Sequence, residues 1–339
     1  MVLVAGCVPV VQPTILPSLP TQEHLPTEPV TKTPAKVTEK SIELTYVKDS
    51  SDYTSSGLYG VDITCMTISK ICFGSSHLIL ETESQLAEQS SKPAGPIIHY
   101  AWSPNGDMLA LELPGDVWVG DLKTQMWKNL TNSSFKIAEY EPKWSSDGKF
   151  IHFNACVENT DQTKTCQPKV VDIFGKEKSI TALFRNGDYA LSPDGQDIVF
   201  SAPNEHGIDR IYRAKLDGTG MQILSTNGDG DIVGEYGAIF SPDGEKILFL
   251  RHTQNANGDE MQDMILRDLI SGDETNLTDD YNDVPAAYVF SPDGFWIAFF
   301  GFDKNLNKKI YLMPLGEKKI IELPDGASGV YPAWRKFEK

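Results

Sequence analysis

The sequence predicts an all-β fold of the propeller type from three observations. One short turn motif occurs five times, its copies are roughly 40 to 50 residues apart, and apolar segments of strand length flank each copy. A repeat of this size is typical of propellers and solenoids. The copies begin at Trp102, Trp144, Leu191, Phe240 and Phe290.

Each repeat is expected to hold four short antiparallel strands. The motif, as in "WSPNG" or "FSPDG", predicts a tight hairpin between the first and second strands, because Gly supplies a positive φ and Asp or Asn caps the turn. Continuous apolar runs follow it, which indicates second strands covered on both faces. These runs are "MLALEL", "FIHFNA", "DIVFSA", "KILFLR" and "WIAFFG". Third strands such as "IYRAKL" and fourth strands ending in "NLT", "TAL", "ILS", "NLT" and "IEL" complete the repeats.

The two ends of the chain complete one further repeat. Near the N-terminus, "ELTYVKD", "LYGVDI" and "KICF" resemble second, third and fourth strands, and the C-terminal "YPAWRKF" resembles a first strand. We therefore expect a six-bladed β-propeller with four antiparallel strands per blade. The last strand would join the first three and close the ring, which removes free sheet edges.

These motifs resemble the TolB-type, WD40-like propeller repeat of bacterial envelope proteins. The resemblance rests on the W-S-P-D-G turn, the aliphatic-x-aromatic strand after it and the "IYxxxL" strand, and it covers residues 41–339. It implies a propeller that serves as a protein-interaction scaffold. The sequence departs from the pattern in two ways: the small α/β domain that precedes the propeller in TolB has no counterpart, and none of that protein's partner-binding residues can be matched.

Composition limits the classes of partner. The chain has 30 basic and 47 acidic residues, a net charge of -17, and 40% hydrophobic residues, enough for a sizeable core. A surface this acidic repels phosphate, which argues against nucleic acid and anionic membranes and favours a basic protein or peptide partner. No run of 18 apolar residues is present that could span a membrane. We expect a monomer.

The N-terminal residues predict an exported lipoprotein. Residues 1–7, "MVLVAGC", resemble the end of a lipoprotein signal, in which Cys7 would be lipidated, although six residues are too few for a complete signal. Residues 8–40 are rich in Pro and Thr, which predicts an extended tether before the propeller at 41–339. Membrane contact would occur only through the lipid on Cys7. The alternative is a chance apolar N-terminus with a free cysteine.

The other four cysteines allow three connectivities. Cys156 and Cys166 flank one hairpin loop, and Cys65 and Cys72 flank another. Two local disulfides, 156 with 166 and 65 with 72, are therefore expected, in agreement with export. Buried reduced thiols are the alternative.

No motif for catalysis or a cofactor is found: the sequence lacks G-x-S-x-G, H-E-x-x-H, C-x-x-C and a phosphate loop. We assign no catalytic residue and no cofactor. The loop "NGDGDIVGE" has oxygen-bearing side chains at calcium-loop spacing but lacks the pattern's Gly and bidentate Glu, so Ca²⁺ is considered only as a weak candidate beside a solvated turn. Its candidate ligands are Asn227, Asp229, Asp231 and Glu235.

A binding site is expected at the mouth of the central channel, at the end of the blades opposite the "SPDG" turns. The loops at that end are long, varied and acidic, among them "TDDYNDVP" and the stretch 75–99, and such loops are where binding residues usually lie. Alignment three residues before each motif aromatic, together with adjacent tyrosines, gives His99, Tyr140, Glu141, Asp188, Tyr236 and Tyr331 as candidate ligand contacts. A water-filled entrance without a ligand is the alternative.

Three hypotheses for function follow. The favoured one is a non-catalytic extracytoplasmic scaffold that binds a protein or peptide partner through its acidic loop face and channel mouth. The second is a carbohydrate-active or lyase-like propeller enzyme in which Glu141 or Asp188 acts with His99 as acid and base. The third is a structural, calcium-stabilised surface protein.

Overall fold

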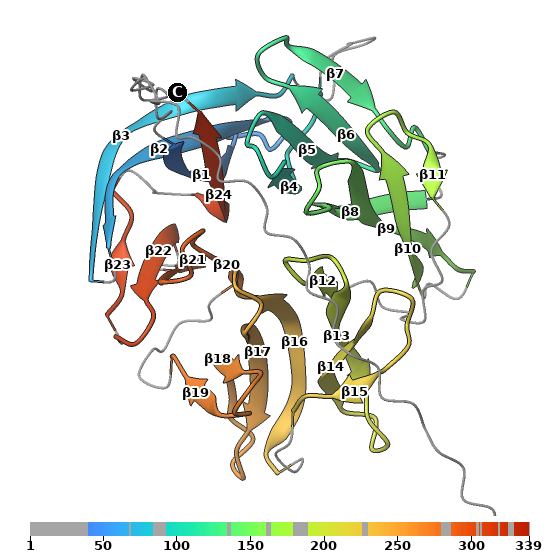
Figure 1. Ribbon diagram of the computed structural model, residues 1–339, viewed down its shortest axis with the longest axis vertical. Coiled ribbons are helices and arrows are strands. Elements are labelled where there is room, and N and C mark those ends of the chain that lie inside the picture. Colours follow the sequence, from blue (N-terminus) through green and yellow to red (C-terminus); the bar gives the residue numbers. More distant parts are fainter. Residues whose placement is uncertain are drawn as a thin grey trace, which may run out of the picture. The chain divides into compact units, whose positions relative to one another are not determined.

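Every regular element in the described part of the chain is a β-strand (Figure 1). The computed structural model describes residues 40–67, 69–83, 93–133, 137–160, 164–178, 189–225, 230–278, 286–302, 305, 307–317, 319–324 and 329–338. They belong to one unit, Glu39–Lys339. The signal at 1–7 with Cys7, and the tether at 8–40 except its last residue, lie outside the described residues. Among the residues described, no helix is long and apolar enough to cross a membrane.

Four of the sheets contain four strands each. One combines the first three strands with the last, in the order β24 (Val330–Glu338), β1 (Lys40–Asp49), β2 (Ser56–Thr67) and β3 (Lys70–Glu81). The other three follow chain order: β4 (His99–Trp102), β5 (Met108–Leu113), β6 (Asp116–Asp121), β7 (Met126–Asn129); β8 (Ile137–Trp144), β9 (Phe150–Glu158), β10 (Lys164–Asp172), β11 (Glu177–Lys178); and β20 (Ala286–Phe290), β21 (Trp296–Phe302), β22 (Lys308–Pro314), β23 (Ile321–Glu322).

The fifth sheet has eight strands and consists of two antiparallel halves. Its halves are joined by the parallel pairing of Asp209 with Gly234. The first half is β12 (Tyr189–Leu191), β13 (Asp197–Pro203), β14 (Asp209–Lys215) and β15 (Gln222–Ile223), and the second is β16 (Ile232–Phe240), β17 (Lys246–Gln254), β18 (Glu260–Asp268) and β19 (Glu274–Asn276).

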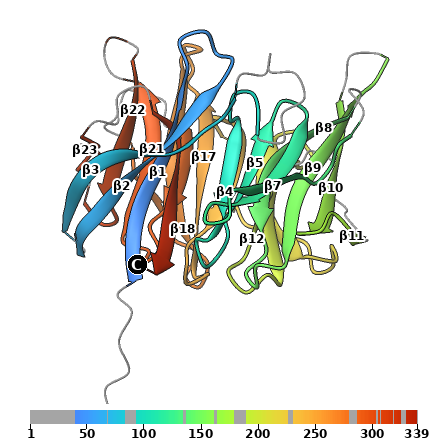
Figure 2. The ribbon, with the colours of Figure 1, turned by 90° about the horizontal axis from the view of Figure 1, so that it is seen from above.

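The sheets surround a common centre, and the first strand of each four-strand group, such as β4, β8 or β20, lies nearest to it (Figure 1). Seen from the side, the strands run between two opposite faces (Figure 2). The apolar runs expected to form second strands coincide with β5, β9, β13, β17 and β21. The all-β propeller prediction is confirmed.

The last strand pairs with the first, as the sequence predicts. In the β24–β1 ladder, Trp334 lies opposite Leu44 and Glu338 opposite Lys40. Trp102 of the next sheet donates a hydrogen bond from its indole Nε1 to Thr45 Oγ1 on β1, at 3.0 Å. The closing sheet is therefore bonded both within itself and to its neighbour.

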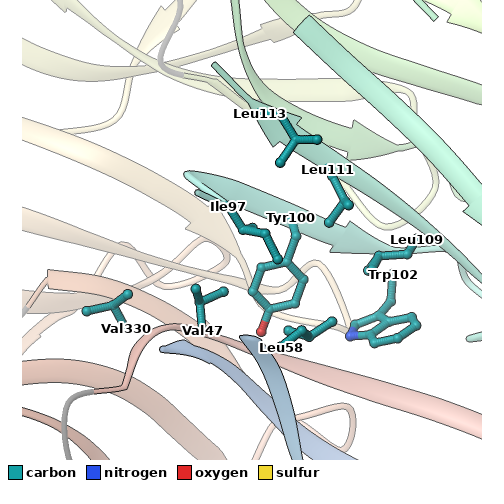
Figure 3. Packing of buried hydrophobic residues seen from close by; sticks show 9 residues of the cluster. All are labelled: Val47, Leu58, Ile97, Tyr100, Trp102, Leu109, Leu111, Leu113 and Val330. Atoms are coloured by element: carbon teal, nitrogen blue, oxygen red, sulfur yellow. The ribbon is translucent and has the colours of Figure 1, made fainter. Parts of the chain in front are cut away.

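The hydrophobic core lies between neighbouring sheets. Figure 3 shows one such cluster, in which side chains of β1, β2 and β24 pack against those of β4 and β5. Fully buried aliphatic residues on both faces of the second strands explain the continuous apolar runs. The members of this cluster are Val47, Leu58, Ile97, Tyr100, Trp102, Leu109, Leu111, Leu113 and Val330.

The repeated turns share one hydrogen-bond pattern. In each, the serine hydroxyl donates to the Asp or Asn two residues later, at 2.5–2.7 Å, and accepts from the backbone N–H five residues later, at 2.9–3.0 Å. The glycine that follows the Asp or Asn has a positive φ. The serines are Ser103, Ser145, Ser192, Ser241 and Ser291.

Neighbouring turns also touch one another. A Cβ placed on Gly148 would lie 3.5 Å from Pro104 Cδ of the preceding turn, and Gly244 and Gly294 face Pro193 and Pro242 in the same way. The first turn has β24 as its neighbour. A Cβ on Gly106, whose φ is +73°, would lie only 1.8 Å from the carbonyl oxygen of Lys336.

Both predicted disulfides are present. Cys65 on β2 is bonded to Cys72 on β3, and Cys156 on β9 is bonded to Cys166 on β10. Each pair consists of directly opposed residues in an antiparallel ladder, which brings their Cβ atoms close enough for a bond. Local pairing was therefore the right choice among the three connectivities.

The expectation that residues 75–99 form one loop is wrong for its first part. Residues 75–81 continue β3, which spans Lys70–Glu81. The apolar residues of "HLIL" explain the difference, because Ile79 and Leu80 pack against the cluster of Figure 3. A strand rather than a loop buries them.

Candidate functional site

The first strands bend at the positions that the sequence alignment selects. Glu141, Gly237, Ala287 and Tyr331 all have positive φ values, of 54°, 69°, 40° and 52°. The pairing register of each of these strands shifts at the same place, which marks a β-bulge. Left-handed backbone is strained for residues with a side chain, and such strain is concentrated at functional sites. The alignment therefore identified equivalent positions in four strands.

His99 occupies the corresponding position on β4 without a register shift, opposite Glu112 of β5. His99 Nδ1 lies 2.7 Å from Glu112 Oε2, and the same oxygen accepts a 2.7 Å hydrogen bond from the backbone N–H of Glu141. The side chain of Glu112 is 1% exposed, whereas that of His99 is 35% exposed. A buried carboxylate thus orients an accessible imidazole and fixes the bent backbone of the next sheet.

Lys143 connects this group to the β12 strand. Its Nζ donates hydrogen bonds to Glu141 Oε2, at 3.0 Å, and to the carbonyl oxygen of Tyr189, at 2.6 Å, and it lies 4.9 Å from the centroid of the Tyr189 ring. Burial acts to raise the pKa of Glu141, but the charge and hydrogen bond of Lys143, with a contribution from His99, hold this pKa below its usual value. Glu141 is therefore ionised at neutral pH.

Tyr331 brings the closing sheet to the same place. Its ring centroid is 4.8 Å from that of His99 and 5.9 Å from that of Phe300. Burial raises the pKa of the Tyr331 phenol, and the charges of Glu112, Asp49 and Glu141 raise it further. We call His99, Glu112, Glu141, Lys143 and Tyr331 the inner-strand cluster.

The other predicted contact residues have different surroundings. Tyr140 precedes the bulge of β8 and pairs with Asn154 in the β8–β9 ladder. Tyr236 lies on β16, where its ring makes an edge contact with His252 at 5.4 Å, and burial followed by Asp209 raises the pKa of its phenol. Asp188 lies outside the described residues. Three of the six predicted residues, His99, Glu141 and Tyr331, are therefore brought together.

The weak calcium candidates do not form a described ligand group. Asn227 and Asp229 lie outside the described residues. Glu235 is fully buried, and its Oε1 accepts a 2.7 Å hydrogen bond from Arg251 Nε and lies 3.5 Å from a terminal nitrogen of Arg210. Across the described ranges, no group of three or more His, Cys, Asp or Glu side chains is arranged to hold a metal ion.

Comparisons with known proteins agree with this architecture. No protein-family model matches the sequence. Tol-Pal system protein TolB from Francisella tularensis is 29% identical over 262 residues, which cover 76% of this chain and 54% of that protein. TolB from Acinetobacter baumannii superimposes with a TM-score of 0.62 at 18% identity, over 86% of this chain and 66% of that one. The chain carries a TolB-like β-propeller. It spans about half the length of the curated relatives it matches.

The structure of an enzyme also has a similar fold. Oligogalacturonate lyase from Vibrio parahaemolyticus superimposes with a TM-score of 0.51 at 12% identity, over 82% of this chain and 78% of that one. Identity this low indicates a common fold and leaves activity to be argued from the residues of the site.

Two residues central to the inner-strand cluster were not predicted from the sequence. Glu112 is the one charged residue in the apolar run "MLALEL", and Lys143 stands between Pro142 and the motif Trp144. Each is a charge in a segment that is otherwise expected to be buried. That signal could have identified both, because a charge is seldom buried without a partner.

Proposed function

We propose that this chain is a non-catalytic extracytoplasmic scaffold whose inner-strand cluster binds a protein or peptide partner at the mouth of a central channel. The observation that carries the proposal is the meeting of charged and aromatic side chains from β4, β5, β8 and β24 around the buried Glu112. His99 and Glu141 are each about a third exposed, so their polar groups are accessible while their positions are fixed. Pre-positioned groups of this kind bind with little loss of conformational entropy.

The proposal includes a six-bladed ring. The eight-stranded sheet divides into two groups of four strands at its single parallel pair, and each group has the same strand order as the other blades. With the closing sheet formed by β24, β1, β2 and β3, the strands then make six blades. The first strands of all blades would surround the channel, with the inner-strand cluster at one end.

Export is the second part of the proposal. Two disulfides on the propeller favour an oxidising compartment, and the relatives named Tol-Pal system proteins support a role in an envelope assembly. We further propose that Cys7 is lipidated, that residues 8–40 tether a monomeric propeller to the membrane, and that the acidic loop face also contacts the partner.

The charges around the inner-strand cluster favour a basic partner. The carboxylates of Glu112, Asp49 and Glu141 add to the effect of burial in raising the pKa of Tyr331, whereas Lys143 is already bonded to Glu141. A cationic side chain that approaches Tyr331 would gain both from these charges and from the face of the aromatic ring.

The same geometry argues against Glu141 as the general acid of the acid–base alternative. A general acid must be protonated at the working pH, and Lys143 keeps the pKa of Glu141 below its usual value. The second carboxylate considered, Asp188, lies outside the described residues. Ca²⁺ binding at Asp231 and Glu235 is also less favoured, because Arg251 and Arg210 already neutralise the Glu235 carboxylate.

A retention experiment tests the binding proposal. The immobilised chain is incubated with detergent-solubilised envelope proteins, beside a variant with Glu141→Gln and Tyr331→Ala and a control with Glu245→Gln. Glu245 is an exposed carboxylate in the motif turn between β16 and β17, away from the inner-strand cluster. Its replacement therefore removes the same charge from a different part of the surface. We expect a protein that is retained by the parent and the control and reduced at least about tenfold by the double variant.

Three results would contradict the proposal: no retained protein, equal retention by all three chains, or loss in the control as well. Circular dichroism of each variant before the experiment separates a lost contact from a lost fold.

A further inference from the structure

A pocket of about 480 Å³ lies on one sheet, apart from the inner-strand cluster. Most of its residues alternate along β17, β18 and β19, which places them on a single face, and Asp231 lies directly before β16. Arg251 is directly opposite Asp263, and Thr253 is opposite Met261, in the β17–β18 ladder. The lining residues are Asp231, Arg251, Thr253, Asn255, Met261, Asp263, Ile265, Glu274 and Asn276.

The same face of the sheet is part of the hydrophobic core at the end nearest the motif turn. Ile247 and Phe249 precede Arg251 on β17 at the same spacing, and both are fully buried in a cluster with Val199 and Ile211 of the neighbouring strands. Ile265 belongs to this cluster and also lines the pocket. The pocket therefore begins where the packing between β13–β14 and β17–β18 ends and the side chains become polar.

Ion pairs saturate part of the pocket wall. Arg251 donates to Glu235 at 2.7 Å and to Glu274 at 2.8 Å, and Arg267 donates to the other oxygen of Glu274 at 2.9 Å. Only 12% of the Arg251 and Glu274 side chains is exposed. These groups neutralise one another and hold the wall in place.

Two carboxylates of the pocket have no such cation. Among the described residues, neither Asp231 nor Asp263 forms an ion pair, because the neighbouring Arg251 is bonded to Glu235 and Glu274 instead. The side chain of Asp263 accepts a 3.3 Å hydrogen bond from Thr278 Oγ1. Thr253 also lines the pocket, and its Oγ1 is shielded from solvent and has no hydrogen-bond partner in the described chain. Met261 and Ile265 contribute apolar surface beside these polar groups.

We propose that this pocket binds a primary ammonium group carried on an aliphatic stem. Asp231 and Asp263 provide the charge, and Met261 with Ile265 packs against the methylene groups. The volume is within the range of roughly 300–1,000 Å³ common for small-ligand sites. Such a group could belong to a basic side chain of a protein or to a free diamine, and the site does not depend on the function proposed for the inner-strand cluster.

The test measures binding of three small probes to the full chain by NMR. Nα-acetyl-lysine-N-methylamide, with a free ε-ammonium group, represents a protein side chain, and cadaverine represents a free diamine. Nα-acetyl-norleucine-N-methylamide has the stem without the charge. We expect one or both amines to shift the methyl resonances of Met261 and Ile265 with saturation, and the norleucine derivative to bind at least about tenfold more weakly. The amine with the lower dissociation constant indicates whether the ligand is a protein side chain or a free diamine.

Variants locate the site. Asp231→Asn together with Asp263→Asn is expected to weaken amine binding about tenfold or more, whereas Glu205→Gln, which removes an exposed carboxylate on the β13–β14 loop, leaves it unchanged. Glu141→Gln is also expected to leave it unchanged, which separates this site from the inner-strand cluster. Equal binding of the norleucine probe, equal binding to the double variant, or no saturable shift with either amine would overturn the proposal.

Discussion

The first strands of the repeats have similar residues at one end and different residues at the other. At one end, five turns use the same serine, acid or amide, and glycine in the same hydrogen bonds. At the other end, the equivalent positions carry a histidine, a glutamate, a glycine, an alanine and a tyrosine, four of them with left-handed backbone.

The difference separates the residues that hold the fold from those that give it a surface. A turn that must fit against its neighbour tolerates one solution, and Gly106, where an added Cβ would lie 1.8 Å from the Lys336 carbonyl oxygen, is an example. The opposite end uses a common bulge to position different side chains. Substitutions at the turn end should therefore change stability, and substitutions of the partly exposed members of the inner-strand cluster should change binding with little effect on stability.

The largest effect is expected at a turn glycine. Gly106→Ala adds a Cβ that would lie 1.8 Å from the Lys336 carbonyl oxygen, in addition to the strain of a positive φ. Gly258→Ala has a similar φ, +85°, but no atom within 4 Å of the new Cβ. By urea unfolding we expect the first variant to lose more than about 3 kcal/mol and the second about 1 kcal/mol. Similar losses in the two variants would show that the turn contact is unimportant.

A smaller loss of stability is expected when one turn loses its serine. Ser291 is fully buried, donates to Asp293 and accepts from the backbone N–H of Trp296 at 2.9 Å. Ser291→Ala leaves that N–H without its partner, which should lower the free energy of unfolding by about 1–3 kcal/mol. The matched change in the inner-strand cluster, Tyr331→Phe, should lower it by less than about 0.5 kcal/mol. Chemical denaturation of both variants makes the comparison, and the reverse order would contradict it.

The smallest effect on stability is expected when a lysine beside a carboxylate is replaced. The comparison is between Glu141, whose pKa is lowered by Lys143, and Asp147, whose pKa is lowered mainly by its own turn. In Lys143→Met, the cation that lowers the pKa of Glu141 is lost and burial remains, so this pKa should rise. In Lys149→Met, the pKa of Asp147 should stay low, because the hydrogen bond from Ser145 is the main cause of its shift and that from the backbone of Lys149 the next. Carbon-13 NMR titration of the two carboxyl groups measures both values.

The pH dependence of stability follows from the sign of these shifts. Glu141 has a lowered pKa in the folded chain, so its contribution is present above its unfolded pKa and is lost as the pH falls through the folded value. Lys143→Met should therefore lower stability at pH 7 by less than about 1 kcal/mol, since Glu141 is partly exposed. The difference from the parent should become smaller in acid, where only the contacts of Lys143 with Tyr189 are still lost. A difference of unchanged size at low pH would show that the charge of Glu141 contributes nothing.

Most of the fold was predictable from local signals. The apolar runs set β5 at Met108–Leu113, identical to the predicted segment, and the motif spacing set the turns. Both disulfides followed from hairpin positions. The extension of β3 to Glu81 was missed, because a single edge strand with polar and apolar residues interspersed resembles a loop in sequence.

The candidate site was predictable only in part. Alignment identified Glu141 and Tyr331 because equivalent positions in a repeat share a place in space. The partnership of His99 with Glu112 depends on the register between β4 and β5, and the reach of Lys143 to Tyr189 depends on the packing of two sheets. Tertiary contacts of this kind have no signature in a local stretch of sequence.

The pairing of β24 with β1 also governs the order in which the protein can fold. Lys40 and Glu338 are partners although nearly the whole described chain separates them, so the closing sheet cannot be completed until β24 has been synthesised. Contacts of such high sequence separation slow folding. Until then the edge of β1 is unpaired and prone to association with other chains. A chaperone that binds the unpaired edge of β1 until β24 has been synthesised would prevent this association.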